Sequence, residues 1–368
     1  MKNEVIETFL DLVKISSPSR KERVLADYIK DRLQAIDVEI MEDDCAKKIN
    51  GNCGNLIVHI VGNGKPILFD AHMDTVMPCE EIHPRIHQDC ISSDGTSILG
   101  ADDKVGIATM LCLIETIKKE DIPHPELFFV FSVCEEDGLQ GVKHIDKRLF
   151  KDVTCAYVLD GEGVVGTVVD RTPHGCKGTL SVIGKEAHAG VCPEQGINAL
   201  KVASEAIAKL PMGRIHPYLT SNIGKIEGGT ARNVVMGKVS MEFEARGYHR
   251  KELEEYVTYV KRSFHEVCDQ YHAQFQEDIK FGTPGYTIEE DDTLWDEFEQ
   301  ICKRCGKTMI KESCGGGSNA NVYRMHGIKS LCLGTNMKEV HSLNEHIGVQ
   351  DIIDLYELLL SICRYKAT

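Results

Sequence analysis

The run from Glu126 to Val133, almost wholly apolar, is the feature that most limits how this chain can fold. A strand that is apolar on both faces must be covered on both faces, as in α/β proteins. Similar runs alternate along the chain with segments of helical periodicity. We expect strands at residues 55–61, 66–70, 126–133, 154–159 and 328–333, and helices at 5–13, 22–36, 105–119, 294–305 and 349–365. This alternation predicts an α/β fold with helices on both faces of a mixed sheet.

The pattern changes between about residues 175 and 279. There the expected order is strand, helix, strand, strand, helix, at 178–183, 199–210, 221–227, 238–245 and 251–271. Such an order predicts a small α+β sandwich inserted into the larger domain. At 368 residues the chain is long enough for two domains, which we place at 1–174 with 280–368 and at 175–279.

Charge and cysteine usage exclude several classes of protein. The net charge of −15 argues against nucleic acid and anionic membrane surfaces as partners. No apolar run approaches the ~20 residues that a membrane span needs. The 15 cysteines are scattered singly through the expected strands and helices, which is typical of reduced thiols. With no signal-peptide core at the N-terminus, we expect a cytoplasmic protein.

Histidines and carboxylates follow the expected strands at the points where these strands end. Ligands in open α/β sheets collect outside the carboxyl ends of the strands, so these side chains are expected to meet at one edge. A further carboxylate opens the helix at 105–119, where the helix dipole stabilises its ionised form. The residues are His72, Asp74, Asp102, Glu135, Glu136, Asp160 and His341.

Two histidines and several carboxylates at one edge are what a binuclear Zn²⁺ centre requires. In such a centre Asp102 can bridge the ions, His72 with Asp160 can hold one of them, and His341 with Glu136 the other. Taken one at a time, each residue also has an ordinary explanation as a turn residue, a helix cap or a surface side chain. The joint pattern carries the prediction.

These residues lie in segments that resemble the M20 metallopeptidases, and the most similar branch is the peptidase T-like tripeptidases. The resemblance covers essentially the whole chain in order and rests on residues 70–75, 99–104, 134–138, 160–161 and 339–342. It implies a phosphorylase/hydrolase-like catalytic domain with two Zn²⁺ per subunit, for which Mn²⁺ or Co²⁺ can substitute. It also implies that Asp74 orients His72, that Glu135 is the general base, and that the inserted domain is a lid that joins two subunits in a homodimer.

The resemblance extends to residues that would contact substrate. It implies that His188 reaches the site of the partner subunit and that Asn233 lies in a lid loop touching substrate. Arg246 is a candidate for a substrate carboxylate or, as we favour, for a structural ion pair. The backbone N–H groups of Gly316 and Gly317 could hold a substrate terminus.

Two positions depart from the family pattern. Related proteins commonly carry Asp where this chain has Asn319. After Arg246 the chain reads Gly247-Tyr248-His249, where the peptidase T-like pattern has a polar residue and then an aromatic-Asp pair. Neither position is an expected metal ligand, so the departures concern substrate preference rather than hydrolysis.

We therefore expect metal-dependent hydrolysis of peptide bonds in short peptides, from the amino end, with Glu135 taking the proton of the attacking water. The alternative is an amidohydrolase of the same scaffold, either a carboxypeptidase or an N-acyl amino acid deacylase. A catalytically silent binding protein is a third reading, which the loss of Glu135 or of a ligand would favour, and all of these residues are present.

Overall fold

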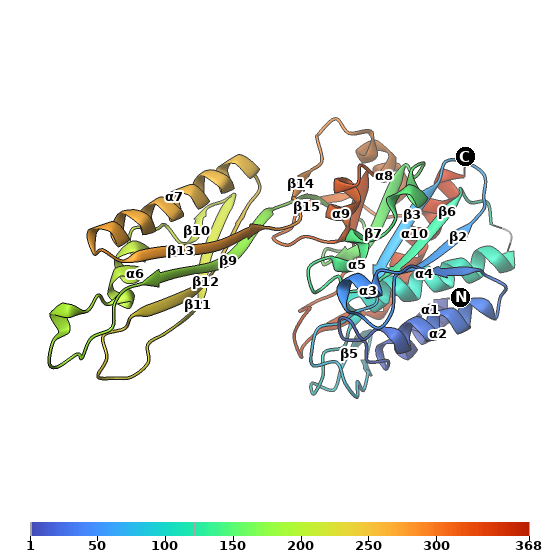
Figure 1. The fold of residues 1–368 in the computed structure, drawn as a ribbon. Coiled ribbons are helices and arrows are strands. Elements are labelled where there is room, and N and C mark those ends of the chain that lie inside the picture. Colours follow the sequence, from blue (N-terminus) through green and yellow to red (C-terminus); the bar gives the residue numbers. More distant parts are fainter. Residues whose placement is uncertain (1, 121, 368) are drawn as a thin grey trace. The chain divides into compact units, whose positions relative to one another are not determined.

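The computed structural model describes residues 2–120 and 122–367 and divides into two compact units (Figure 1). Unit 1 comprises Met1–Asp170 and Ile288–Thr368, and unit 2 comprises Arg171–Thr287. Unit 2 is wider than the expected 175–279, because its strands run past both of those limits.

The sheet of unit 1 has the strand order β1-β2-β6-β3-β7-β16-β8-β14, and β15 pairs with β8. Its central neighbours β6, β3, β7 and β16 run parallel, whereas β1, β2, β8 and β14 pair antiparallel. Every residue of β3 is buried, so this strand is covered on both faces as the apolar runs predict. The strands are β1 Ile40–Glu42, β2 Leu56–Ile60, β3 Ile67–His72, β6 Leu127–Ser132, β7 Cys155–Gly161, β8 Thr167–Thr172, β14 Tyr286–Thr287, β15 Ile310–Ser313 and β16 Ser330–Gly334.

Helix α4 is the central helix of unit 1. It packs against β3 and β7 and against α1 and α10. It is buried along most of its length, unlike the amphipathic helices α2 and α8. The helices are α1 Lys2–Val13, α2 Arg23–Gln34, α3 Ala46–Ile49, α4 Ala101–Glu120, α5 Gln140–Lys143, α8 Thr293–Arg304, α9 Asn319–Met325 and α10 Val349–Lys366. A separate small sheet has the order β17-β5-β4, with β4 Arg85–His87, β5 Cys90–Ser92 and β17 His346–Gly348.

Unit 2 is an antiparallel sheet of order β10-β11-β12-β9-β13 with two helices, α6 and α7 (Figure 1). The sequence predicts β9, β11, β12 and both helices, and misses β10 and β13. Both missed strands lie at the edges of the sheet, and neither has a fully buried residue, so their sequences lack a strong apolar alternation. The bounds are β9 His174–Ile183, α6 Ala199–Ile207, β10 Gly213–His216, β11 Leu219–Gly228, β12 Lys238–Gly247, α7 Arg250–Gln270 and β13 Gln274–Phe281.

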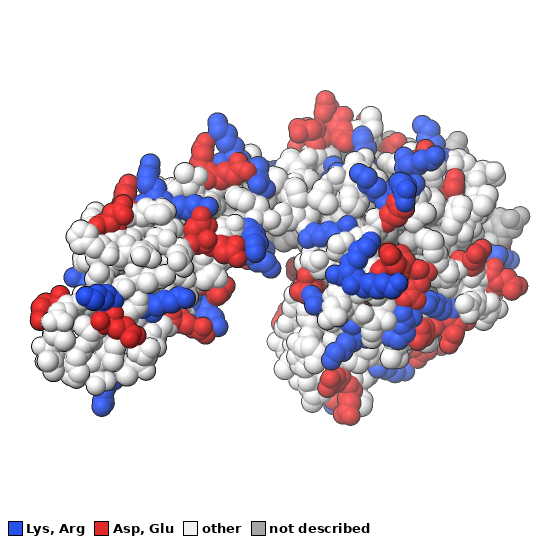
Figure 2. All heavy atoms as spheres, in the orientation of Figure 1, with Lys and Arg blue, Asp and Glu red and all other residues white. Residues whose placement is uncertain are grey.

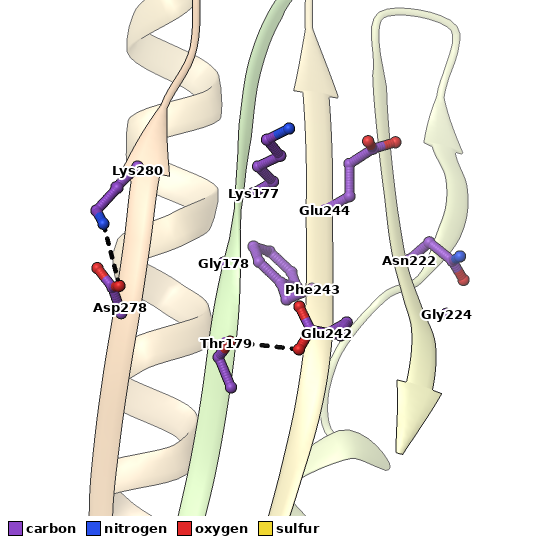
Figure 3. Close-up of a pocket in the computed structure, with 10 residues that line it drawn as sticks. All are labelled: Lys177, Gly178, Thr179, Asn222, Gly224, Glu242, Phe243, Glu244, Asp278 and Lys280. Atoms are coloured by element: carbon purple, nitrogen blue, oxygen red, sulfur yellow. Dashed lines mark hydrogen bonds and ion pairs between the residues drawn. The ribbon is translucent and has the colours of Figure 1, made fainter. Parts of the chain in front are cut away.

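The two faces of the unit 2 sheet differ in character. One face packs on α6 and α7 through a core that includes Leu180, Phe243 and Phe264. The strands also border a hollow of about 550 Å³, shown in Figure 3, whose polar lining includes Lys177, Thr179, Glu242, Glu244, Asp278 and Lys280. Among the described residues, no cluster of candidate metal ligands lies in this hollow.

The surface and the helices also bear on the expected partners. On the visible face, acidic and basic side chains are interspersed rather than gathered into one basic patch (Figure 2). In the part of the chain that the structure describes, no helix is both long and apolar enough to cross a membrane.

Candidate metal centre

His72 and Asp102 meet where β3 ends and α4 begins. The Nε2 of His72 lies 2.9 Å from Oδ1 of Asp102. Asp102 and Asp103 have non-helical backbone angles, so regular helix begins only after them. The Asp103 carboxylate caps this start, because it accepts the N–H of Gly106 at 3.1 Å, and it also accepts the N–H of His72 at 3.2 Å. Asp103 thus fills the capping role and leaves the Asp102 carboxylate to face the histidines.

The second histidine approaches the other oxygen of Asp102. The Nε2 of His341 lies 3.2 Å from Oδ2 of Asp102 and 2.7 Å from Oε1 of Glu136. On the His72 side, Oδ1 of Asp160 lies 3.9 Å from Nε2 of His72. The two oxygens of Asp102 therefore face different histidines, and each histidine has a second carboxylate nearby.

The potential ligand atoms form three overlapping groups, in each of which all atoms lie within 4.8 Å of one another. The groups are His72 with Asp102 and Asp160, His72 with Glu135 and Glu136, and Asp102 with Glu136 and His341. Asp102 belongs to the first group and the third. A carboxylate shared by two such groups is the geometry needed to bridge two ions.

The protonation of these side chains reflects their crowding. Burial raises the pKa of Glu135 and of Asp160 well above the ordinary range, and neighbouring carboxylates add to both shifts. Burial opposes charge on His72 as well, but hydrogen bonds to Asp102 and Asp74 outweigh it and raise its pKa. Hydrogen bonds to Asp102 and Glu136 raise the pKa of His341 to about 10. The crowded carboxylates thus favour the binding of protons by the cluster, since positive charge relieves their repulsion. Divalent cations would supply the same positive charge.

Asp74 contacts the centre in more than one way. The backbone carbonyl of Asp74 lies 2.8 Å from Nδ1 of His72, and its carboxylate Oδ1 lies 3.5 Å from the same atom. The carboxylate accepts the N–H of Glu135 at 2.9 Å, the N–H of Glu136 at 3.1 Å and the hydroxyl of Ser19 at 2.6 Å. The Asp74 carboxylate therefore holds the backbone of the loop that carries Glu135 and Glu136. The backbone carbonyl of Asp74 is the group nearest to the His72 imidazole.

Sequence reasoning missed two side chains that support the centre, Ser19 and Glu345. Glu345 is buried and accepts the N–H of Gly100 at 2.6 Å and that of Asp102 at 3.1 Å. Burial raises the pKa of Glu345 to about 7. Both residues lie in loops, where no periodicity marks them. The only signal for Glu345 was its closeness in the sequence to His341, and nothing in the sequence marked Ser19.

The predicted substrate residues are divided between the two units. His188 and Asn233 lie in unit 2 on adjoining loops, joined by a bridge between His188 and Val234 and by the Ala189 N–H donating to the Asn233 carbonyl at 2.9 Å. Arg246 lies on β12 and pairs with Glu244 at 3.0 Å, as a structural ion pair would.

The glycines predicted to bind substrate lie in unit 1, in the loop before α9. The N–H of Gly316 donates to Sγ of Cys314 at 3.3 Å, within this loop. Gly317 is exposed and precedes Ser318, whose hydroxyl caps α9.

The chain is similar in sequence to several known proteins, peptidases among them. Residues 175–274 match the peptidase dimerisation domain of the M20 proteins, and residues 55–189 match peptidase family M28. Peptidase T of Clostridium perfringens is 27% identical over 295 residues, covering 76% of this chain and 69% of its own. The uncharacterized protein YqjE of Bacillus subtilis is 34% identical, covering 99% of this chain and 98% of its own.

Two solved structures are similar along the whole chain. The aminopeptidase PepT of Bacillus cereus has 34% identity and a TM-score of 0.93, covering 100% of this chain and 99% of that one. A tripeptidase of Staphylococcus aureus has 30% identity and a TM-score of 0.95, with the same coverage. The mixed α/β fold and the site at its strand ends thus define a metallopeptidase of the M20 type. The chain belongs to the peptidase T-like branch of that family, which confirms the predicted fold class and family.

Proposed function

We propose that this chain is a two-zinc peptidase that cleaves short peptides, tripeptides above all, from the amino end. The observation that carries the proposal is the position of Asp102, with one oxygen 2.9 Å from His72 and the other 3.2 Å from His341. The donor set fits two ions, because each histidine is accompanied by a second carboxylate and Asp102 is common to both groups.

The proposed ligands are His72, Asp102 and Asp160 for one ion and His341, Asp102 and Glu136 for the other. Ions bound there would polarise the scissile carbonyl and lower the pKa of an attacking water. Zn²⁺ is proposed because imidazole and carboxylate ligands suit it, and Mn²⁺ or Co²⁺ could substitute.

Glu135 is the proposed general base. Its carboxyl makes no hydrogen bond to any described residue, so it is available to accept a proton from water and deliver it to the leaving amine. Its neighbour Glu136 contacts His341, so adjacent carboxylates divide the two roles. The Asp74 carboxylate holds the backbone N–H of both.

Unit 2 is proposed to join two subunits and to supply His188 to the partner's site. The match of this unit to the dimerisation domain supports this proposal. A second support is the edge of β11, because β10 pairs only with the Leu219–Ser221 end of β11. On the uncovered part of β11, Ile226 is 49% exposed. An exposed apolar residue on an open strand edge favours pairing with a second chain. His188 would then donate a hydrogen bond to the developing oxyanion.

The names of the two similar structures, an aminopeptidase and a tripeptidase, support the amino end and the tripeptide as substrate. The alternative, a carboxypeptidase or N-acyl amino acid deacylase, needs a cation for the substrate carboxylate. Arg246, the residue predicted for that role, pairs with Glu244 and so does not favour the alternative. The 15 free cysteines fit a reducing compartment, and we propose the cytoplasm.

A substrate panel tests the proposal. The protein is loaded separately with Zn²⁺, Mn²⁺ and Co²⁺ and assayed on a tripeptide, the same tripeptide N-acetylated, a dipeptide and an N-acyl amino acid. We expect release of the first residue from the free tripeptide and little cleavage of the acetylated one. Cleavage of the N-acyl amino acid in place of the tripeptide would assign the amidohydrolase activity instead.

A further inference from the structure

Consecutive backbone N–H groups fix the loop that carries Glu135. The N–H of Cys134 donates to Oε1 of Glu22 at 3.1 Å. The next two, of Glu135 and Glu136, donate to the two oxygens of Asp74 at 2.9 and 3.1 Å. Both acceptors are side chains with 0% exposure. The direction of the Glu135 side chain therefore depends on where the two buried carboxylates lie.

This loop needs external support, because its backbone is in an unfavourable conformation. Cys134 has φ of 51°, in the left-handed region that residues with a side chain rarely adopt. Such a conformation persists where surrounding contacts impose it. The contacts that do so here include the hydrogen bonds that the carboxylates of Glu22 and Asp74 accept from the backbone of the loop.

Both supports lead to one short N-terminal segment, residues 19–22. The hydroxyl of Ser19 donates to Oδ2 of Asp74 at 2.6 Å, the same oxygen that accepts the N–H of Glu136. Glu22 belongs to this segment and also accepts the N–H of Arg20 at 2.9 Å. The Arg20 guanidinium forms an ion pair with Asp137, next to the loop.

The segment is itself attached to the elements that carry the proposed ligands. The N–H of Thr75, just after β3, donates to the carbonyl of Ser17 at 2.9 Å. The buried ammonium of Lys104, on α4, donates to the carbonyl of Ile15 at 2.8 Å. Residues 15–22 therefore connect the elements bearing His72 and Asp102 to the loop bearing Glu135.

We propose that Ser19 is a positioning residue, which sets the direction of Glu135 by fixing the rotation of the Asp74 carboxylate. Without the Ser19 hydroxyl, each oxygen of the Asp74 carboxylate keeps one backbone N–H, that of Glu135 or that of Glu136. The carboxylate then loses the one side-chain hydroxyl that fixes its rotation, and the loop that it holds gains freedom to move. Glu22 supports the Cys134 end of the same loop. The inference rests on the proposed function, since the direction of Glu135 matters because Glu135 is the proposed base.

Kinetics of three variants test the role of Ser19. In Ser19→Ala we expect kcat to fall roughly 10-fold, as one lost hydrogen bond to a charged group implies, with KM and metal content unchanged. Ser19→Thr keeps the hydroxyl and should restore most of kcat. Ser17→Ala is the matched control, because the Ser17 hydroxyl is buried in the same segment and has no hydrogen-bond partner in the described chain. It should behave as the wild type.

Two results would overturn the inference. One is a lower melting temperature in Ser19→Ala with kcat unchanged, which would mean that Ser19 serves stability alone. The other is an equal loss of kcat in Ser17→Ala, which would mean that packing of the segment matters and the Ser19 hydroxyl does not.

A measurement independent of activity separates this inference from the proposed function. Amide hydrogen exchange of fragments covering residues 133–139 should be faster in Ser19→Ala than in the wild type or Ser17→Ala. If the wild type cleaves no peptide, the proposed function fails, and the exchange data still decide whether Ser19 holds the loop. Unchanged exchange in Ser19→Ala would reject the positioning role.

Discussion

The side-chain amide of Asn319 donates to Oδ1 of Asp70 at 2.8 Å, on the strand that also carries His72. The same amide nitrogen lies 2.8 Å from Oγ of Ser132, and the hydroxyl of Tyr323 donates to Oδ2 of Asp70 at 2.8 Å. All four side chains are buried. A neutral donor at position 319 thus satisfies a carboxylate that lies two residues before His72. This pairing gives a structural reason for Asn319, the departure from the family pattern noted in the sequence.

Asn319→Asp should destabilise the protein, because it replaces the donor to Asp70 with a second buried carboxyl group. We expect a loss of about 3 kcal/mol in the free energy of unfolding, since the Asp70 carboxylate loses a hydrogen bond and gains a second buried carboxyl group beside it. The double variant with Asp70→Asn exchanges the two groups and should regain most of this loss. Urea unfolding of the single and double variants measures the coupling. Additive effects would show that positions 70 and 319 do not interact.

Glu135→Ala should abolish turnover and leave the metal content near two ions per subunit, because Glu135 is proposed as a base and not as a ligand. Loss of a general base costs about 10²–10⁴-fold in rate. Activity on a tripeptide and metal analysis of the same sample check both parts. Glu162→Ala, which removes an exposed carboxylate shortly after Asp160, is the control. An active Glu135→Ala enzyme would rule out the proposed base.

Metal stoichiometry should distinguish the bridging ligand from a terminal one. His341→Ala removes a proposed ligand of one ion and should leave about one ion per subunit, whereas Asp102→Ala removes the proposed shared ligand and should leave less. His346→Ala provides the histidine control, because its ring contacts the Asn344 carbonyl at 2.9 Å and belongs to none of the ligand groups. Equal metal content in the His341 and Asp102 variants would contradict a bridging role for Asp102.

Stability should depend on pH through Glu22. Burial raises the pKa of Glu22 from 4.5 to about 7, and the charge of Asp74 adds to the shift. The native state then binds this proton more tightly than the unfolded state does. The protonated Glu22 therefore contributes stability that is fully present below the unfolded pKa, and this stability is lost as the pH rises through about 7. Relative to Glu22→Gln, the free energy of unfolding of the wild type should fall by about 3 kcal/mol between about pH 4 and about pH 8. Urea unfolding of the metal-free proteins measures this difference, and a constant difference would refute the assignment.

The sequence predicts the candidate centre where strand topology brings residues together. His72 is the last residue of β3 and Asp160 lies near the end of β7, a neighbouring parallel strand, so their closeness follows from the ends of two apolar runs. Ser19 and Glu345 could not be found in this way. Their contacts with Asp74 and with the backbone of Asp102 depend on the paths of loops, which no local pattern encodes.

The contrast between segments with a clear local pattern and segments without one also explains why the sequence misses β10 and β13 in unit 2. Strands β9 and β12 lie inside the sheet, and the alternating burial of β12 matches its alternating sequence. Strand β13 is mostly exposed at the sheet edge, and Glu277 interrupts the alternation of its apolar residues Phe275, Ile279 and Phe281, so the sequence predicts no strand there. Edge strands owe their conformation to a neighbouring strand more than to their own residues.

Mixed dimers test whether His188 acts across the subunit interface. Inactive Glu135→Ala and His188→Ala subunits, combined by joint refolding, should form heterodimers with one site that has both residues. If mixing is random, about half of the dimers are of this kind and each has one working site, so activity should recover to about a quarter of the wild-type value. Mixing Glu135→Ala with a Glu135→Ala/His188→Ala double variant should give no recovery, since no subunit then carries Glu135. Full activity in His188→Ala alone, or no recovery in the first mixture, would show that the site needs nothing from its partner.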